Sequence, residues 1–256
     1  MKMNTKGFDI KKLFDTMRPL AYSVMFLLLL INGCTSQQIK KEPGAKGLYD
    51  KALGEMKGGV FGPDYEEIRQ TLNQIVDNYP YSTYAPLAQL RIADTYFKQG
   101  RYLESAEAYD HFIKMYPNDR EVPYAVFKEG KSYLENQKTW LFHSIPYDID
   151  ETGIYNALDE FNYIVNYYPS SKYFKDAQRY AKLCNYTLAR HDLYIADFYI
   201  AHDHYEAAID RLKEIPELYP NSGLVEQALK KLAYLYKKIN SIQEYDKTVK
   251  LLKQNH

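Results

Sequence analysis

The sequence predicts an all-α fold made of five successive helical hairpins. Apolar residues recur at helical spacing through most of residues 48–253, without the sustained alternation that is typical of strands. Proline ends a helix because it lacks a backbone N–H and clashes with the preceding turn. Four Tyr-Pro pairs end such segments, and their prolines are 37, 52 and 51 residues apart: Tyr79-Pro80, Tyr116-Pro117, Tyr168-Pro169 and Tyr219-Pro220. Stops that recur at such intervals indicate an array of hairpins, each too small to bury its own apolar face.

Residues 1–33 are expected to be an export signal. Basic residues outnumber Asp9 and Asp15 in the first 18 positions, and an apolar run follows over residues 19–31. As a helix that run would span about 20 Å, whereas the hydrocarbon core of a bilayer is roughly 30 Å thick. The segment is therefore interpreted as a signal peptide and excluded from the fold.

The end of this segment, Ile31-Asn32-Gly33-Cys34, resembles a bacterial lipoprotein signal. The resemblance implies a diacylglyceryl thioether on Cys34, cleavage before it, and acylation of the new N-terminus, as with palmitate. Two or more acyl chains anchor a protein stably, whereas one holds it only marginally. Thr35 follows the cysteine instead of an aspartate, which favours the outer membrane as destination. The alternative is an ordinary signal peptide with a chance cysteine.

Residues 34–47 are polar and include Pro43 and Gly44, so we expect a flexible tether between membrane and domain. The other cysteine, Cys184, falls in a predicted helix over residues 173–199. With Cys34 lipidated it has no partner in the chain, which predicts a buried, inert thiol and no disulfide.

The clearest hairpin covers residues 86–117 and resembles a tetratricopeptide repeat. Small residues at repeat positions 8 and 20 let two antiparallel helices approach, and aromatic residues at 11 and 24 fill the space between neighbours. The matching residues are Ala93, Tyr96, Gly100, Tyr102, Ser105, Tyr109, Phe112 and Pro117. The resemblance implies a right-handed superhelical array.

Other segments fit the same frame. N-terminal repeats are expected over residues 48–138, and C-terminal repeats over 154–256. Between them, residues 139–153 form an inserted loop that delays the second helix of the third repeat. The loop contains Trp140-Leu141-Phe142, which indicates either a plug over the core or a contact site. The fourth repeat begins with an extended helix from Tyr173.

A lipoprotein signal, five such repeats, an insertion in the third and a long helix in the fourth together resemble the BamD family, also called ComL. The resemblance implies a non-enzymatic subunit of the outer-membrane β-barrel assembly machinery on the periplasmic face. Its partners would be a BamA-like barrel subunit at the C-terminal repeats and unfolded outer-membrane proteins at the N-terminal repeats. Residues 144–150 depart from the acidic insertion loop of the family. The alternative is another repeat scaffold for envelope maintenance or division. Three phrases support the resemblance: Tyr79-Pro80-Tyr81-Ser82-Thr83-Tyr84-Ala85, His111-Phe112-Ile113-Lys114 and Asp150-Glu151-Thr152.

Two binding surfaces are expected. In tetratricopeptide arrays, positions 2, 5, 9 and 12 of each first helix line a concave groove, here predicted to take an aromatic-ended peptide. Alternatively, some of these side chains pack against adjacent repeats. In the family frame Arg211 corresponds to an arginine at the barrel-subunit interface, although a pair with Glu214 within its helix is the alternative. The predicted groove residues are Leu87, Leu90, Asp94, Phe97, Tyr124, Phe127 and Lys131.

Composition argues against several function classes. The chain has 33 basic and 33 acidic residues, so it lacks the basic excess expected for nucleic-acid binding. A mean hydropathy of −0.53 excludes a polytopic membrane protein. No catalytic constellation, cofactor motif or metal-ligand spacing is present, and His202-Asp203-His204 is expected to be a solvated turn. The protein is therefore not expected to be an enzyme.

Overall fold

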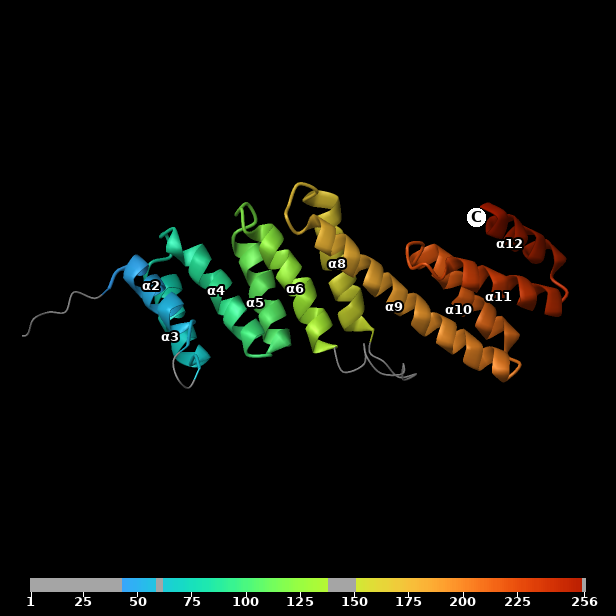
Figure 1. The fold of residues 1–256 in the computed structure, drawn as a ribbon, viewed down its shortest axis with the longest axis horizontal. Helices are drawn as coiled ribbons and strands as arrows, with labels where there is room; N and C mark the ends of the chain where they lie inside the picture. Colours follow the sequence, from blue (N-terminus) through green and yellow to red (C-terminus); the bar gives the residue numbers. More distant parts are fainter. Residues whose placement is uncertain (1–42, 59–61, 138–150, 255–256) are drawn as a thin grey trace, which may run out of the picture. The chain divides into compact units, whose positions relative to one another are not determined.

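The computed structural model describes residues 43–58, 62–137 and 151–254, all within one structural unit, Pro43–His256. In these ranges the chain forms ten helices and no strand, and Figure 1 shows each helix beside the next one in sequence. The all-α prediction is confirmed. No described helix has both the length and the apolar character needed to cross a membrane. The helices are α2 Ala45–Glu55, α3 Tyr65–Asn78, α4 Tyr84–Lys98, α5 Tyr102–Met115, α6 Val122–Asn136, α8 Thr152–Tyr167, α9 Phe174–Ala201, α10 Tyr205–Leu218, α11 Val225–Lys238 and α12 Ile242–Gln254.

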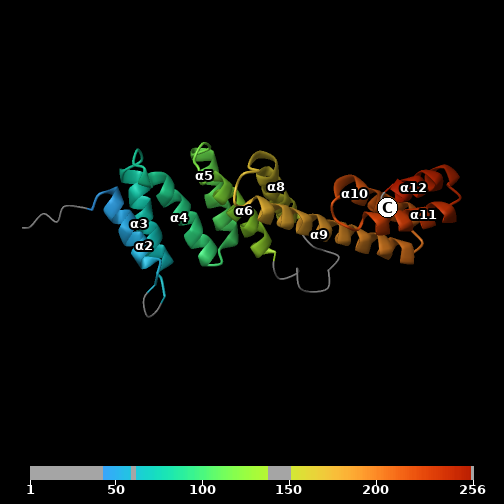
Figure 2. The same cartoon turned by 45° about the horizontal axis from the view of Figure 1, so that its top comes forward.

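The helices pair as five hairpins: α2–α3, α4–α5, α6–α8, α9–α10 and α11–α12. Each second helix also packs on the first helix of the next hairpin, and α2 contacts α4. The view in Figure 2 shows the same succession of hairpins. This is the packing expected of tetratricopeptide-like repeats, in which neighbouring units complete one another's core.

Two predicted boundaries need correction. Helix α2 begins at Ala45, so the last three residues of the expected tether, 45–47, are helical. Helix α8 begins at Thr152, inside the C-terminal end of the expected inserted loop. The extended helix of the fourth repeat is confirmed, since α9 is 28 residues long.

The four Tyr-Pro pairs end four second helices in one shared conformation. Each tyrosine is the C-cap of its helix, with φ between −133° and −124° and ψ between 49° and 56°. Clash with the proline ring keeps the preceding residue out of the helical region, which explains the shared geometry. The structure therefore confirms these pairs as helix stops.

The turns inside the α4–α5, α9–α10 and α11–α12 hairpins each place one residue in the left-handed backbone region. Gly100 has φ +78° between α4 and α5, as expected for a glycine after a helix. Asp203 and Asn240 occupy the corresponding turns with φ +58°. His202 and His204 flank Asp203 and are exposed, so the expected solvated turn is confirmed.

Small and aromatic residues fill the core as the repeat pattern requires. Ala93 and Ser105 are fully buried between α4 and α5, and Tyr109 and Phe112 are buried beside them. Cys184 is free and 1% exposed, and burial raises the pKa of its thiol to about 12. The predicted burial of this thiol is confirmed, and its raised pKa disfavours the reactive thiolate at neutral pH.

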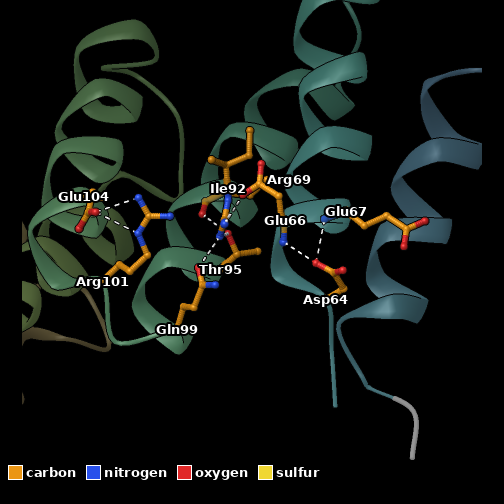
Figure 3. Close-up of polar contacts among 9 residues, drawn as sticks. All are labelled: Asp64, Glu66, Glu67, Arg69, Ile92, Thr95, Gln99, Arg101 and Glu104. Atoms are coloured by element: carbon orange, nitrogen blue, oxygen red, sulfur yellow. Dashed lines mark hydrogen bonds and ion pairs between the residues drawn. The ribbon is translucent and has the colours of Figure 1, made fainter. Parts of the chain in front are cut away.

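A buried arginine joins the first hairpin to the second, as Figure 3 shows. Arg69 of α3 is 3% exposed and donates to Gln99 Oε1 at 2.9 Å and Thr95 Oγ1 at 3.3 Å, both on the α4 side. Its guanidinium also pairs with Glu66 Oε2 at 2.7 Å and lies 4.4 Å from the centroid of the Tyr96 ring. These contacts hold α4 against α3, and thereby set the position of α4 relative to α2.

Candidate functional site

A cavity of about 420 Å³ lies between α2, α4 and α6, the first helices of three hairpins. In tetratricopeptide-like repeats this is the helix face on which a ligand groove is expected. Among the described residues its lining combines aromatic, aliphatic and cationic side chains. The lining residues are Tyr49, Leu53, Met56, Lys57, Arg91, Asp94, Phe97, Lys98, Tyr124 and Lys128.

Asp94 is the buried centre of a hydrogen-bond network at this cavity. It is 5% exposed, and its Oδ1 accepts from Tyr109 Oη at 2.5 Å and from Tyr124 Oη at 2.6 Å. Its Oδ2 pairs with the Arg91 guanidinium, which also donates to Tyr49 Oη at 3.4 Å. One carboxylate therefore ties α4 to α5 and α6, and through Arg91 to α2.

The network keeps its hydroxyl groups protonated. Burial, followed by the Asp94 charge, raises the pKa values of Tyr109 and Tyr124 well above that of free tyrosine. Desolvation opposes the charge on Arg91, but Asp94 and Tyr49 outweigh it and raise the pKa of the guanidinium. Asp94 thus accepts from three donors, one of them cationic.

Lys128 is the partly buried lysine of the cavity, whereas Lys57 and Lys98 are exposed. Its Nζ lies 3.0 Å from the centroid of the Phe97 ring, and no carboxylate of the described residues forms an ion pair with it. Burial lowers the pKa of the half-buried Lys128 to about 8, despite the attraction of Asp94. A cation–π contact compensates part of the lost hydration, but it does not neutralise the charge.

The structure brings only three of the seven predicted groove residues to the cavity: Asp94, Phe97 and Tyr124. The prediction for Leu90 is wrong, because it is 1% exposed and belongs to the hydrophobic core. Leu87 is partly buried against the N-terminal core cluster. Leu87 and Leu90 therefore pack between repeats and do not line a groove, which is the alternative given for some of the predicted groove residues.

Phe127 and Lys131 connect α6 to α9 and do not line the cavity. The Phe127 ring stacks on Tyr173 with centroids 5.1 Å apart. Lys131 Nζ lies 3.1 Å from Glu135 Oε1 and donates to Tyr180 Oη at 3.0 Å. Both side chains are therefore committed to the interface with the long helix.

The missed residues follow a simple pattern. Pro86 and Pro123 begin their repeats, and Arg91 and Lys128 each stand five residues later, at repeat position 6. Position 6 thus lines the cavity in both repeats, whereas position 5, occupied by Leu90 and Phe127, does not. Cations at the same position of two successive repeats were a sequence signal for this face.

Arg211 lies between two carboxylates. Its Nη1 is 3.5 Å from Glu214 Oε2 within α10 and 3.5 Å from Asp192 Oδ1 of α9. Asp192 is buried, and desolvation, followed by repulsion from Glu214, raises its pKa to about 6. The expected intrahelical pair exists, while the Arg211 side chain remains 43% exposed for a further contact.

Two predicted sites, Cys34 and the Trp140-Leu141-Phe142 cluster, lie outside the described residues. Within the described ranges, no group of three or more His, Cys, Asp or Glu side chains is arranged to hold a metal ion.

The fold defines a class: tetratricopeptide-like proteins built of helical hairpins. Residues 42–251 match the YfiO family, described as outer membrane lipoprotein, and the chain belongs to this family. The resemblance predicted from the sequence is thus confirmed.

The chain is similar to two proteins called outer membrane protein assembly factor BamD. The Vibrio cholerae protein is 24% identical, over 91% of this chain and 97% of its own length. The Neisseria gonorrhoeae protein is 26% identical, over 89% of this chain and 87% of its own length. A solved structure of MamA from Desulfovibrio magneticus RS-1 shares 14% identity at a TM-score of 0.40, covering 83% of this chain and 96% of that one.

Proposed function

We propose that the protein is a non-enzymatic, lipid-anchored subunit of the machinery that assembles outer-membrane β-barrels. The observation that supports this best is the family match over residues 42–251, together with relatives named as outer-membrane protein assembly factors that align over almost their whole length. In this proposal the protein works by binding and positioning, and it makes or breaks no covalent bond.

Lipidation of Cys34 is the proposed means of anchoring, after removal of residues 1–33. Cys34 precedes the first residue of α2, Ala45, by eleven positions. A chain extends at most about 3.6 Å per residue, so the lipid would hold α2 within roughly 40 Å of the outer membrane, on its periplasmic face. Replacing Cys34 with Ala is expected to move the protein from the membrane to the soluble fraction. Unchanged membrane retention would refute lipid anchoring.

The cavity between α2, α4 and α6 is proposed to receive an aromatic-ended segment of an unfolded outer-membrane protein. Its volume of about 420 Å³ lies in the range that pockets for small ligands and anchor side chains occupy. Tyr49, Phe97 and Tyr124 offer aromatic surface, and Leu53 and Met56 add aliphatic surface. An aromatic side chain buried in such a pocket is the usual anchor of a peptide interface.

The C-terminal hairpins, α9–α10 and α11–α12, are proposed to bind a BamA-like barrel subunit through a surface that includes Arg211. Its guanidinium is already oriented by Glu214 and Asp192 and remains partly exposed. A carboxylate of the partner would find a pre-positioned donor there.

Affinity purification from detergent-solubilised envelopes tests this function. The tagged protein is expected to co-purify a large barrel subunit that has periplasmic repeats. Arg211→Ala should reduce its yield, whereas Arg101→Ala should not, because Arg101 forms a similar exposed pair with Glu104 in an N-terminal hairpin. Absence of the barrel subunit, with recovery of envelope-maintenance or division proteins, would establish the alternative scaffold.

A further inference from the structure

We propose that the exposed side of α9 contacts a phospholipid surface through a row of aromatic and cationic side chains. The row, called the α9 row below, consists of Tyr186, Arg190, Tyr194 and Phe198. This inference rests on the lipid anchoring proposed for Cys34, which brings the folded repeats to the membrane. It adds a second, non-covalent contact, in which Arg190 binds lipid phosphate and the rings enter the boundary between headgroups and acyl chains.

The members of the α9 row stand four residues apart along one helix. Residues at this spacing are neighbours on successive turns, so the row forms a continuous ridge about 18 Å long. The Cζ atom of Arg190 lies 5.8 Å from the centroid of the Tyr186 ring. Tyr186, Tyr194 and Phe198 are 40%, 42% and 55% exposed. The row is therefore an aromatic surface that the described part of the chain leaves largely uncovered.

The opposite side of α9 is occupied by its neighbours in the array. Both α8 and α10 pack along this helix. Asp192 lies 3.5 Å from Arg211 of α10, so α10 covers the side on which Asp192 stands. Tyr194 follows Asp192 by two residues, which is about 200° around the helix. A lipid layer against the α9 row would therefore meet the side of α9 that faces away from α10.

The charge along the α9 row is positive. Arg190 is partly buried, and its Nε atom has no hydrogen-bond partner among the described residues. Two acidic residues of α9, Asp176 and Asp197, already pair with Arg179 at 2.9 Å and with Lys231 at 2.5 Å. The Arg190 guanidinium therefore has donors available for an anion, and a phosphate group accepts two parallel hydrogen bonds from a guanidinium.

A phospholipid layer suits this combination better than a peptide does. All members of the α9 row come from one helix, so they form a ridge, whereas the cavity between α2, α4 and α6 is a hollow between helices. Tyrosine has an apolar ring and a polar tip, which suits the boundary between headgroups and acyl chains. Helices that lie in this boundary combine aromatic residues with cations that attract anionic lipids. The lipid proposed on Cys34 would keep such a layer beside the repeats.

Fluorescence quenching of the mature lipoprotein in vesicles of phosphatidylethanolamine and phosphatidylglycerol tests the inference. The chain has a single tryptophan, so Trp140→Phe provides a background for single-tryptophan variants. Phe198→Trp should lose about half of its emission when the acyl chains carry bromine, because an interfacial helix reaches roughly 5–10 Å into the layer. Leu218→Trp, at a similarly exposed position of α10, should lose almost none. Adding Arg190→Gln to Phe198→Trp should lower the quenching about twofold.

Flotation of the vesicles separates this contact from lipid anchoring. Protein that floats, with Phe198→Trp quenched no more than Leu218→Trp, would overturn the α9 contact and leave anchoring intact. Protein that does not float would overturn both. A short-wavelength emission of Phe198→Trp before vesicles are added would show that the chain itself covers the row. A shift that appears only with an added barrel subunit would assign the row to a protein partner, and either result would overturn the lipid contact. Unchanged quenching in Arg190→Gln, with circular dichroism showing a folded protein, would overturn the role of Arg190.

Discussion

At the scale of single residues, Asp94 connects the helices that form the cavity. Its carboxylate accepts from Tyr109 and Tyr124 and pairs with Arg91, so three helices meet at one side chain, and Arg91 extends the network to Tyr49 of α2. Tyr109 is completely buried, and its hydroxyl therefore depends on Asp94 for a partner. Buried polar groups of this kind are stabilising only as a complete set, because a lost partner leaves the others unpaired.

Asp94→Asn should lower the free energy of unfolding by about 2–3 kcal/mol, because the amide cannot neutralise Arg91 and its NH₂ group meets donors. Urea unfolding followed by circular dichroism measures the change. Asp176→Asn is the matched control, since Asp176 pairs with Arg179 at the surface and such pairs contribute at most about 1 kcal/mol. Equal effects of the two substitutions would show that the Asp94 network is not stabilising.

The chemistry of the cavity was only partly predictable from single residues. Asp94, Phe97 and Tyr124 were found from the repeat frame, because side-chain direction follows from helical periodicity. Leu90 was misplaced because its position borders both the cavity face and the core face of α4, and packing against neighbouring helices buries it. Lys57, Lys98 and Lys128 were missed because long flexible cations are ordinary on helix surfaces. Their meaning depends on which carboxylates lie nearby, and only the packed helices show that.

At the scale of elements, α5, α6 and α8 meet around an acidic cluster that opposes their packing. Glu129 of α6 is 5% exposed, and burial, followed by repulsion from Glu160 and Asp110, raises its pKa to about 9. Burial likewise raises the pKa of Glu160 on α8 to about 7. Two other groups lower the pKa of Glu129 but do not outweigh its burial. Tyr133 donates a hydrogen bond to it at 3.4 Å, and the positive charge of Lys114 attracts it.

The sign of the resulting pH dependence follows from proton binding. In the unfolded chain a glutamate loses its proton near pH 4.3, whereas folded Glu129 keeps it until about pH 9. The folded state therefore binds more protons throughout this window, and the free energy of unfolding falls as pH rises through it. The Glu160 carboxyl adds a similar decrease that ends near pH 7.

Glu129→Gln should therefore raise the free energy of unfolding at pH 8 by about 2 kcal/mol and leave it nearly unchanged at pH 4. Relaxation of the structure and entry of water limit the penalty of ionising the buried carboxyl. Thermal or urea unfolding at several pH values checks it. Glu67→Gln, at an exposed position of α3, should show neither effect. Identical pH profiles for Glu129→Gln and the unmodified protein would contradict the assignment.

Most helices could be predicted, because their signals are local. A Tyr-Pro pair disfavours helical backbone at its tyrosine, and Gly100 provides the left-handed turn that the frame requires. The starts of α2 and α8 were less predictable, since polar residues such as Lys46 and Thr152 are compatible with both loop and helix. Which faces of the hairpins become surface depends on contacts between repeats, and these are not encoded in any single segment.

At the scale of the whole molecule, client binding and partner binding are proposed to lie on different repeats of the chain. The N-terminal hairpins provide a cavity with aromatic walls and surplus positive charge. The C-terminal hairpins provide Arg211, held between two carboxylates and still partly exposed. With the lipid proposed on Cys34, this arrangement would hold a client-binding pocket and a partner-binding surface in one chain beside the membrane.

Site-specific photo-crosslinking in cells tests most directly whether the cavity of the N-terminal hairpins binds the client. A photo-reactive phenylalanine analogue replaces Phe97 in the cavity or, as the control, Tyr167, an exposed residue of the second helix α8. A pulse-labelled outer-membrane barrel protein is then followed during its assembly. A crosslink is expected from position 97 that disappears when the last residue of the client is deleted, and none is expected from position 167. A client crosslink that forms equally at both positions, or at neither, would contradict client binding in the cavity.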